Sequence, residues 1–170
     1  MSENNIIIRA AELPDAVRIA EIYNAGILSR QATFETVLRS EADIAGWLEP
    51  ASKKLVLVAV RNGQVAGWAS IDSYRSRECY QGIAEYSVYI APEVQGQGLG
   101  LQLLPRLIDL AESKGYWKLL SRIFPENVAS LKLCVRCGFR EVGIYQKHAK
   151  LDDKWRDVVI VERLIETNLK

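Results

Sequence analysis

A glycine-rich segment, Gln95-Gly96-Gln97-Gly98-Leu99-Gly100, has the composition and position of a ligand-binding turn. Glycine has no Cβ, so a backbone with three glycines in six residues can approach a ligand closely. The segment leads into leucines at helical spacing, and the free N–H groups at the start of a helix attract phosphate. We therefore expect a phosphate-containing ligand here, such as a pyrophosphate.

Two familiar phosphate loops do not fit this segment. The dinucleotide fingerprint needs glycine where Leu101 stands, and the P-loop needs a Lys-Ser or Lys-Thr pair that the segment lacks. A Rossmann enzyme and a P-loop NTPase are therefore disfavoured, and an unrelated nucleotide-binding domain is a weak alternative.

The elements that would position the glycine-rich segment follow one another along the whole chain. Runs of β-branched and aromatic residues predict strands, and apolar residues at helical spacing predict helices. Asn62-Gly63 predicts a tight hairpin turn, and Pro105 predicts a kink in its helix. The predicted order is strand 6–9, helix 17–23, helix 40–48, strands 55–60, 65–71 and 84–90, helix 99–115, strand 118–123, helix 127–137, and strands 139–145 and 158–164.

This order predicts an α/β fold with a central mixed sheet flanked by helices. The 170 residues fall in the size range of one domain, and no linker-like tract divides them, so we expect a single domain over residues 1–170.

The composition argues against several classes of partner. Lys and Arg number 22 against 21 Asp and Glu, so no overall field attracts nucleic acid or anionic membranes. No segment is apolar over about 18 residues, and the N-terminus does not look like an export signal, so we expect a cytoplasmic protein. Cys79, Cys134 and Cys137 cannot all pair within one chain, and Cys134-x-x-Cys137 lacks a second metal-ligand pair. We therefore expect reduced thiols and no metal.

Two segments together resemble those of the GCN5-related N-acetyltransferases. Gln95, Gly98 and Gly100 stand at the defining positions of that family's Q-x-x-G-x-G/A acetyl-CoA loop. Asn127-x-x-Ser130, followed by Cys137-Gly138-Phe139, resembles its N-x-x-S/A…G-F segment. The order of elements is also that family's order across nearly the whole chain.

The resemblance implies acetyl-CoA as cosubstrate and a strand that splays from its neighbour to pair with the pantetheine arm. Asn127 and Ser130 would help to hold the pantetheine and phosphate end. The implied cofactor-binding residues are Val88, Tyr89, Ile90, Gln95, Gly96, Gln97, Gly98, Leu99, Gly100, Asn127 and Ser130.

Acetyl transfer to nitrogen needs a base for the ammonium proton and a donor to the oxygen of the thioester. Glu85 lies two residues before Ser87-Val88-Tyr89 and is our candidate base. The family implies backbone N–H groups near Val88 as the oxyanion donors. Many relatives have an acidic Tyr or His where Cys134 stands, so Cys134, His148 and water remain candidates for protonating the thiolate. We expect His148 to lie in an exposed polar connection.

Within the family, the chain most resembles the phosphinothricin and methionine sulfoximine acetyltransferases, which acetylate the α-amino group of glutamate-like analogues. The resemblance makes Glu85 the base. Arginine forks bind carboxylate and phosphinate oxyanions well, which suits Arg75 and Arg77, and Phe34 and Tyr80 could wall the aliphatic part. The matching stretches are Thr33-Phe34-Glu35-Thr36, Tyr74-Arg75-Ser76-Arg77 with Tyr80, Ala84 to Tyr89, and Lys154 to Val158.

The expected function is therefore acetylation of a small amino acid or toxic analogue, of the phosphinothricin, arsinothricin or methionine sulfoximine type, giving resistance or detoxification. Two alternatives remain open. One is an acetyltransferase for a protein N-terminus or a polyamine, and the other is a non-catalytic acyl-CoA-binding module. Relatives are commonly homodimers, so the resemblance also implies a homodimer.

Overall fold

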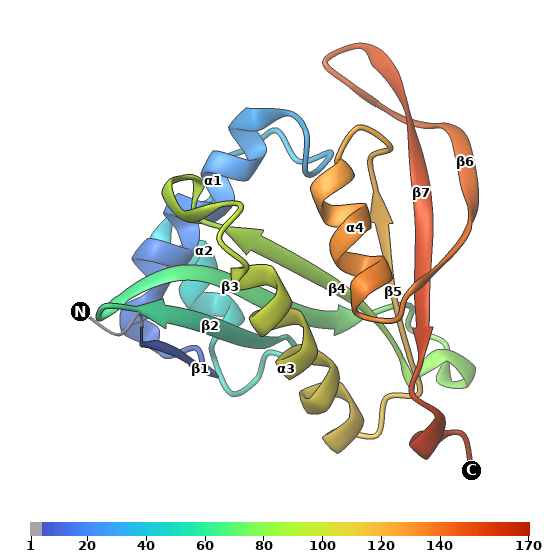
Figure 1. Cartoon of the computed structure of the whole chain (residues 1–170), viewed down its shortest axis with the longest axis horizontal. Helices are drawn as coiled ribbons and strands as arrows, with labels where there is room; N and C mark the ends of the chain where they lie inside the picture. Colours follow the sequence, from blue (N-terminus) through green and yellow to red (C-terminus); the bar gives the residue numbers. More distant parts are fainter. Residues whose placement is uncertain (1–4) are drawn as a thin grey trace.

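Within residues 5–170, which the computed structural model describes, seven strands form one mixed sheet (Figure 1). Only the β4–β5 pair is parallel, and the other neighbours are antiparallel. Across the sheet the strands are β1 (Ile6–Ala10), β2 (Leu55–Arg61), β3 (Gln64–Ser73), β4 (Ile83–Ile90), β5 (Lys118–Ile123), β7 (Lys154–Leu164) and β6 (Arg140–Leu151).

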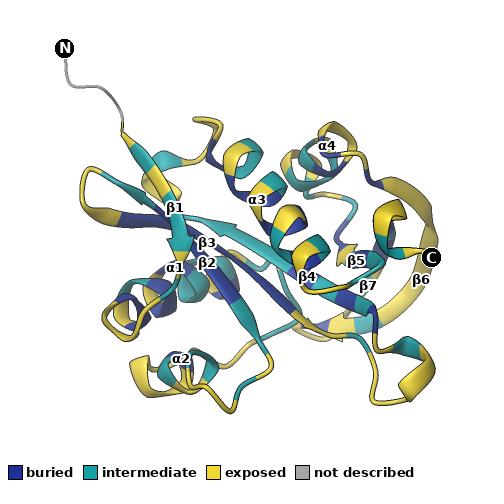
Figure 2. Ribbon diagram, turned by 90° about the horizontal axis from the view of Figure 1, so that it is seen from below, coloured by how far each residue is buried: buried dark blue, intermediate teal, exposed yellow. Residues whose placement is uncertain are grey.

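Helices cover both faces of the sheet (Figure 2). One face carries α1 (Ala16–Ser29) and α2 (Glu41–Trp47), and the other carries α3 (Leu99–Ser113) and α4 (Val128–Arg136). Short 3₁₀ turns are η1 (Leu13–Asp15), η2 (Glu78–Tyr80), η3 (Pro92–Val94) and η4 (Glu166–Asn168). The predicted fold class and order of elements are confirmed.

Local sequence explains where several of these elements begin and end. Ser40 caps α2 by accepting a hydrogen bond from the Asp43 N–H, and the Asp43 carboxylate accepts one from the Ser40 N–H. Asn62 and Gly63 both have positive φ, as the tight turn between β2 and β3 requires. Helix α3 continues through Pro105, whose missing N–H removes one helical hydrogen bond without ending the helix.

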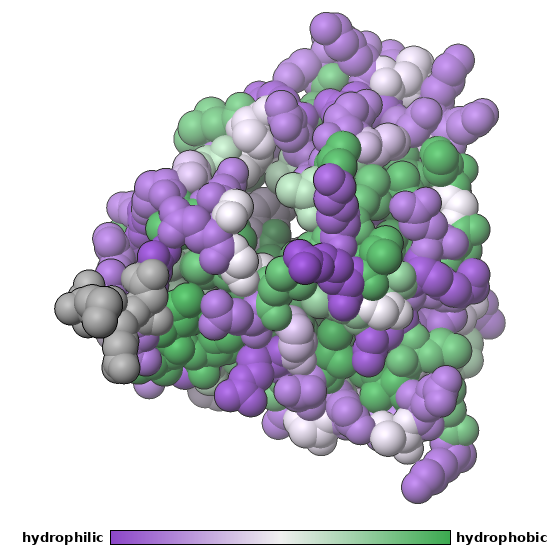
Figure 3. Space-filling view, viewed as in Figure 1, coloured by the Kyte–Doolittle hydropathy of each residue, from purple (hydrophilic) through white to green (hydrophobic). Residues whose placement is uncertain are grey.

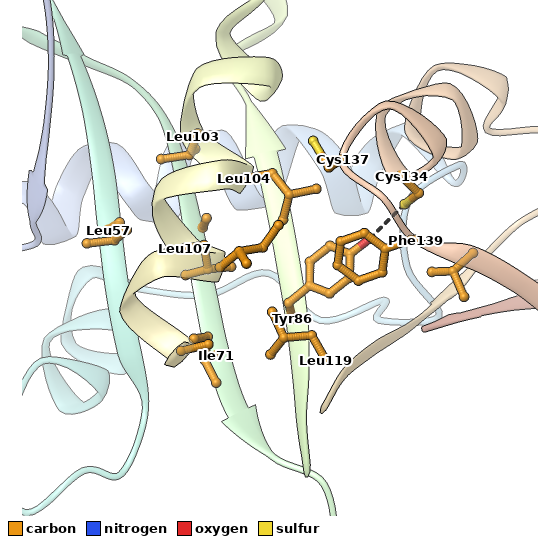
Figure 4. Packing of buried hydrophobic residues seen from close by; sticks show 14 of the residues in the cluster. Leu57, Ile71, Tyr86, Leu103, Leu104, Leu107, Leu119, Cys134, Cys137 and Phe139 are labelled. Carbon is orange, nitrogen blue, oxygen red and sulfur yellow. Dashed lines mark hydrogen bonds between the residues drawn. The ribbon is translucent and has the colours of Figure 1, made fainter. Parts of the chain in front are cut away.

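Two hydrophobic cores hold the layers together. Leu103, Leu104 and Leu107 of α3 are fully buried in a cluster that includes residues of β2, β3, β4 and β5 (Figure 4). On the opposite face, Trp68 of β3 packs beneath α1 and α2. Strands β2 to β4 are therefore packed against helices on both faces of the sheet.

Strands β4 and β5 pair over only three residues. Ile83, Ala84 and Glu85 pair with Lys118, Leu119 and Leu120, and beyond them the two strands diverge. Strand β4 nevertheless continues to Ile90 along β3 on its other side. The splay implied by the resemblance is therefore present, and it leaves one edge of β4 without a strand partner after Glu85.

The C-terminal hairpin differs from the prediction. Residues 146–150, expected as an exposed connection, belong to β6, which pairs with β7 through an irregularity between Tyr145 and Ala149. Lys147 there has a φ of 48°, as an inserted bulge residue would. This part of β6 is polar because β6 is an edge strand with an exposed surface, so its sequence lacks the apolar residues that predict a strand.

Leu104 of α3 provides a test of the core. Replacing fully buried Leu104 with alanine leaves a cavity beneath α3, so the free energy of unfolding should fall by about 2–5 kcal/mol. Leu28→Ala on the exposed side of α1 is the control, with an expected change within about 0.5 kcal/mol. Urea denaturation measures both variants, and equal effects would contradict this view of the core.

Candidate active site

A cavity of about 540 Å³ opens between α1, β4, the glycine-rich segment and α4. In the view of Figure 3 the surface is hollowed between the part that carries α1 and the part that carries α4. Every predicted cofactor-binding residue except Gln97 lines it, namely Val88, Tyr89, Ile90, Gln95, Gly96, Gly98, Leu99, Gly100, Asn127 and Ser130. We call it the first cavity.

The glycine-rich segment has a backbone that other residues rarely adopt. Gly96 and Gly98 have φ values of 75° and 82°, in the left-handed region that favours glycine. Gly98 is the N-cap of α3. Because glycine has no side chain, it cannot accept a hydrogen bond from the first N–H groups of that helix. Lys132 and Arg136 of α4 line the same cavity and add positive charge, which our sequence reasoning missed.

The two glutamines of this segment have different roles. Gln95 donates from Nε2 to the Ile90 carbonyl at 3.1 Å and so ties the turn to the end of β4. The Gln97 side chain accepts a hydrogen bond from the Arg61 guanidinium at the end of β2. Gln97 therefore anchors the segment to the β2–β3 hairpin and does not line the first cavity.

Asn127 and Ser130 connect α4 to the cavity wall. The Asn127 side chain accepts a hydrogen bond from the Ser130 N–H at 3.2 Å and caps α4. Its Nδ2 donates to the Gln31 carbonyl at 3.4 Å, just beyond α1. Asn127 thus links the start of α4 to the segment that follows α1.

A second cavity of about 370 Å³ adjoins the first where β4 and β5 diverge. Glu85, Phe34 and Glu35 line it, and Phe34 packs edge-on against Phe124 with ring centroids 4.8 Å apart. The residues that line both cavities are Ala32, Val88, Tyr89, Asn127, Ser130 and Leu133. A group held in one cavity can therefore meet a group held in the other beside Val88 and Tyr89.

Glu85 forms an ion pair that the sequence did not predict. Nη1 of Arg122 lies 2.9 Å from both carboxylate oxygens, and about a third of each side chain is exposed. Glu85 lies beside Leu120 in the parallel register, and Arg122 follows Leu120 by two residues, so both charged groups project from the same face. The available signal was an arginine within a predicted strand, two residues after Leu120.

The other predicted substrate residues lie elsewhere in this chain. Arg75, Arg77 and Tyr80 line neither cavity. The Arg75 guanidinium lies over the Tyr74 ring, that of Arg77 lies over Tyr80, and the two tyrosines meet edge-on. The segment between β3 and β4 thus forms an exposed cluster at the end of β4 opposite to the glycine-rich segment.

Neither candidate side chain for protonating the thiolate lines a cavity. Cys134 is 1% exposed, and its Sγ lies 2.7 Å from the Tyr86 hydroxyl (Figure 4). Burial raises the pKa of the Cys134 thiol, which makes it a poor acid. His148 is exposed on β6, with its ring 5.1 Å from that of Tyr145.

The cysteines, the possible metal ligands and the length of the helices also bear on the sequence-based expectations. All three cysteines are free thiols, and only Cys79 is exposed. Among residues 5–170, no group of three or more His, Cys, Asp or Glu side chains is placed to hold a metal ion. None of the described helices combines the length and apolar character needed to cross a membrane.

Comparison with known proteins identifies the family. The profile described as the acetyltransferase (GNAT) family matches residues 19–139. The L-amino acid N-acyltransferase MnaT of Escherichia coli is 34% identical over 91% of this chain and 91% of its own length. The L-methionine sulfoximine/L-methionine sulfone acetyltransferase of Salmonella typhimurium is 34% identical over 91% of this chain and 92% of its own.

A solved structure gives the same result. The phosphinothricin acetyltransferase of Sinorhizobium meliloti, crystallised with acetyl-CoA, superposes with a TM-score of 0.86 at 28% identity, covering 94% of this chain and 88% of that one. The profile match, the sequence identities and the shared fold agree. The chain therefore belongs to the GNAT family and is an acetyl-CoA-dependent N-acetyltransferase.

Proposed function

We propose that this enzyme acetylates the α-amino group of a small glutamate-like amino acid or a toxic analogue of the phosphinothricin or methionine sulfoximine type. The observation that carries the proposal is Glu85 in a second cavity that meets the first beside Val88 and Tyr89. The names of the relatives support the substrate class, since they include amino acids and these analogues. The homodimer, the cytoplasmic location and a role in resistance stay predictions.

The first cavity fits acetyl-CoA, which supplies the acetyl thioester when bound. The start of α3 at Gly98 presents N–H groups for phosphate oxygens, and Lys132 and Arg136 offset their charge. The free edge of β4 offers N–H and C=O groups to the amides of the pantetheine arm. These groups together account for the charged and the amide parts of the cofactor.

In this proposal the chemistry takes place where the two cavities meet. The Glu85 carboxylate accepts the ammonium proton, so that the neutral amine can attack the acetyl carbon. Backbone N–H groups of β4 near Val88 donate to the oxygen that gains negative charge. Since Cys134 and His148 line neither cavity, water protonates the departing thiolate.

Helical glycines provide a test of the cofactor site. A Cβ on Gly26 of α1 would lie 2.7 Å from the Tyr89 ring, which lines both cavities. We expect Gly26→Ala to displace that ring, raise the KM for acetyl-CoA by about tenfold or more, and reduce the increase in Tm caused by CoA.

Gly46→Ala is the matched control, because it lies in α2 and its new Cβ would contact nothing within 4 Å. It should leave the KM unchanged and keep or slightly raise stability. If both variants bind CoA as the unmodified enzyme does, the first cavity is not the cofactor site.

The base is tested by Glu85→Gln, which keeps the shape of the side chain but removes its proton-accepting carboxylate. We expect kcat to fall by about a hundredfold or more with little change in the KM for acetyl-CoA. Release of free thiol from acetyl-CoA measures turnover with glutamate analogues, ordinary amino acids, polyamines and a short peptide. Glu49→Gln, at an exposed site after α2, should behave as the unmodified enzyme does.

Turnover confined to amino acids and their analogues would support the proposed substrate class. Turnover confined to polyamines or to the peptide would refute it while leaving the acetyltransferase activity intact. A kcat for Glu85→Gln within a few fold of the unmodified enzyme would remove Glu85 as the base.

A further inference from the structure

The second cavity contains one cation among the described residues that line it. Its charged lining consists of Glu35, Glu85 and Arg122. Glu35 already has a partner, since its carboxylate lies 2.8 Å from Nη2 of Arg39, which does not line the cavity. Arg75 and Arg77, expected to bind an oxyanion of the substrate, lie outside the cavity. An anionic group in this cavity therefore has Arg122 as its nearest positively charged partner in the lining.

The guanidinium of Arg122 retains donors for such a group. Nη1 alone contacts the two oxygens of Glu85, at 2.9 Å each. In the described part of the chain, Nη2 and Nε of Arg122 donate no hydrogen bond to a protein acceptor. Guanidinium groups bind carboxylates through two parallel N–H donors, and Nη2 with Nε is one such pair.

The Glu85–Arg122 pair matches the charges of an α-amino acid. Such a molecule carries an ammonium and a carboxylate on the same carbon atom, so the two charges are neighbours. Glu85 and Arg122 place a carboxylate and a guanidinium in contact, on one face of adjacent strands, in the lining of the second cavity. Ammonium against Glu85 and carboxylate against Arg122 is the arrangement in which both contacts are attractive.

We propose that Arg122 binds the α-carboxylate of the substrate and that Glu85 and Arg122 together recognise its zwitterionic head. This inference rests on the proposed function and narrows it to amines that carry a carboxylate on the same carbon. A polyamine has no anion for Arg122, and a protein N-terminus has an uncharged amide in that place. Arg122 thus determines specificity, while Glu85 remains the base.

The test compares methionine sulfone with its carboxamide, which has the same shape but no carboxylate charge. Both are assayed with the unmodified enzyme, Arg122→Gln and Arg122→Lys, and kcat/KM is measured for each. We expect the unmodified enzyme to prefer the acid by about tenfold or more. In Arg122→Gln this preference should fall to within about threefold through a higher KM for the acid, and Arg122→Lys should restore part of it.

Two controls separate binding from folding. Arg106→Gln removes an exposed guanidinium from α3 and should keep the preference for the acid. The increase in Tm caused by CoA should be the same in Arg122→Gln as in the unmodified enzyme, because Arg122 does not line the first cavity.

The outcomes distinguish this inference from the proposed function. If the unmodified enzyme acetylates methionine sulfone and Arg122→Gln slows the acid and the carboxamide equally, Arg122 only positions Glu85 and the inference is wrong. If the unmodified enzyme does not acetylate amino acids or their analogues but does acetylate other amines, the proposed function fails, and the inference fails with it.

Discussion

Beyond Glu85, β4 keeps its hydrogen bonds to β3 but loses its pairing with β5, and both cavities lie along the edge that this divergence exposes. Unpaired backbone groups away from water are costly, so adjacent strands normally stay together. Here side chains satisfy part of the edge, since Ser121 donates to the Tyr86 carbonyl and Gln95 donates to that of Ile90. The remaining N–H and C=O groups of this edge are available to the amide groups of a ligand.

Packing on both faces maintains this divergence. Tyr86 lies just past the last paired residue, and its ring packs against Phe139 while its hydroxyl contacts the Cys134 thiol of α4. Cys134 is therefore part of the hydrophobic core. On the other face, Tyr89 stacks on Trp68 and contacts Tyr23, which holds the end of β4 against α1. The cavity walls are thus continuous with the cores.

The ion pair between Glu85 and Arg122 contributes little to the stability of this fold. Pairs that are about a third exposed are screened by solvent and typically contribute about 0–1 kcal/mol. A charged pair at that position is more informative about ligands, because it faces the second cavity beside the divergence. Arg75 and Arg77 differ from Arg122, because they do not line the second cavity and their guanidinium groups lie over tyrosine rings.

The sequence by itself determined the features that depend on neighbours along the chain. Periodicity predicted the order of helices and strands, and the glycines predicted a ligand-binding turn, where Gly96 and Gly98 have positive φ. Two spaced motifs predicted segments that line the first cavity. Glu85 and Phe34, chosen because both lie in stretches that resemble those of relatives, line one cavity in the structure.

Only the tertiary structure decided which side chains meet across strands and helices. Arg122 is 37 residues from Glu85, and their contact depends on the parallel register of β4 and β5. The burial of Cys134, the outward position of Arg75 and the bond between Gln97 and Arg61 likewise depend on the packing of distant elements. Local spacing predicts which face of an element a residue occupies, but it carries no information on what packs against that face.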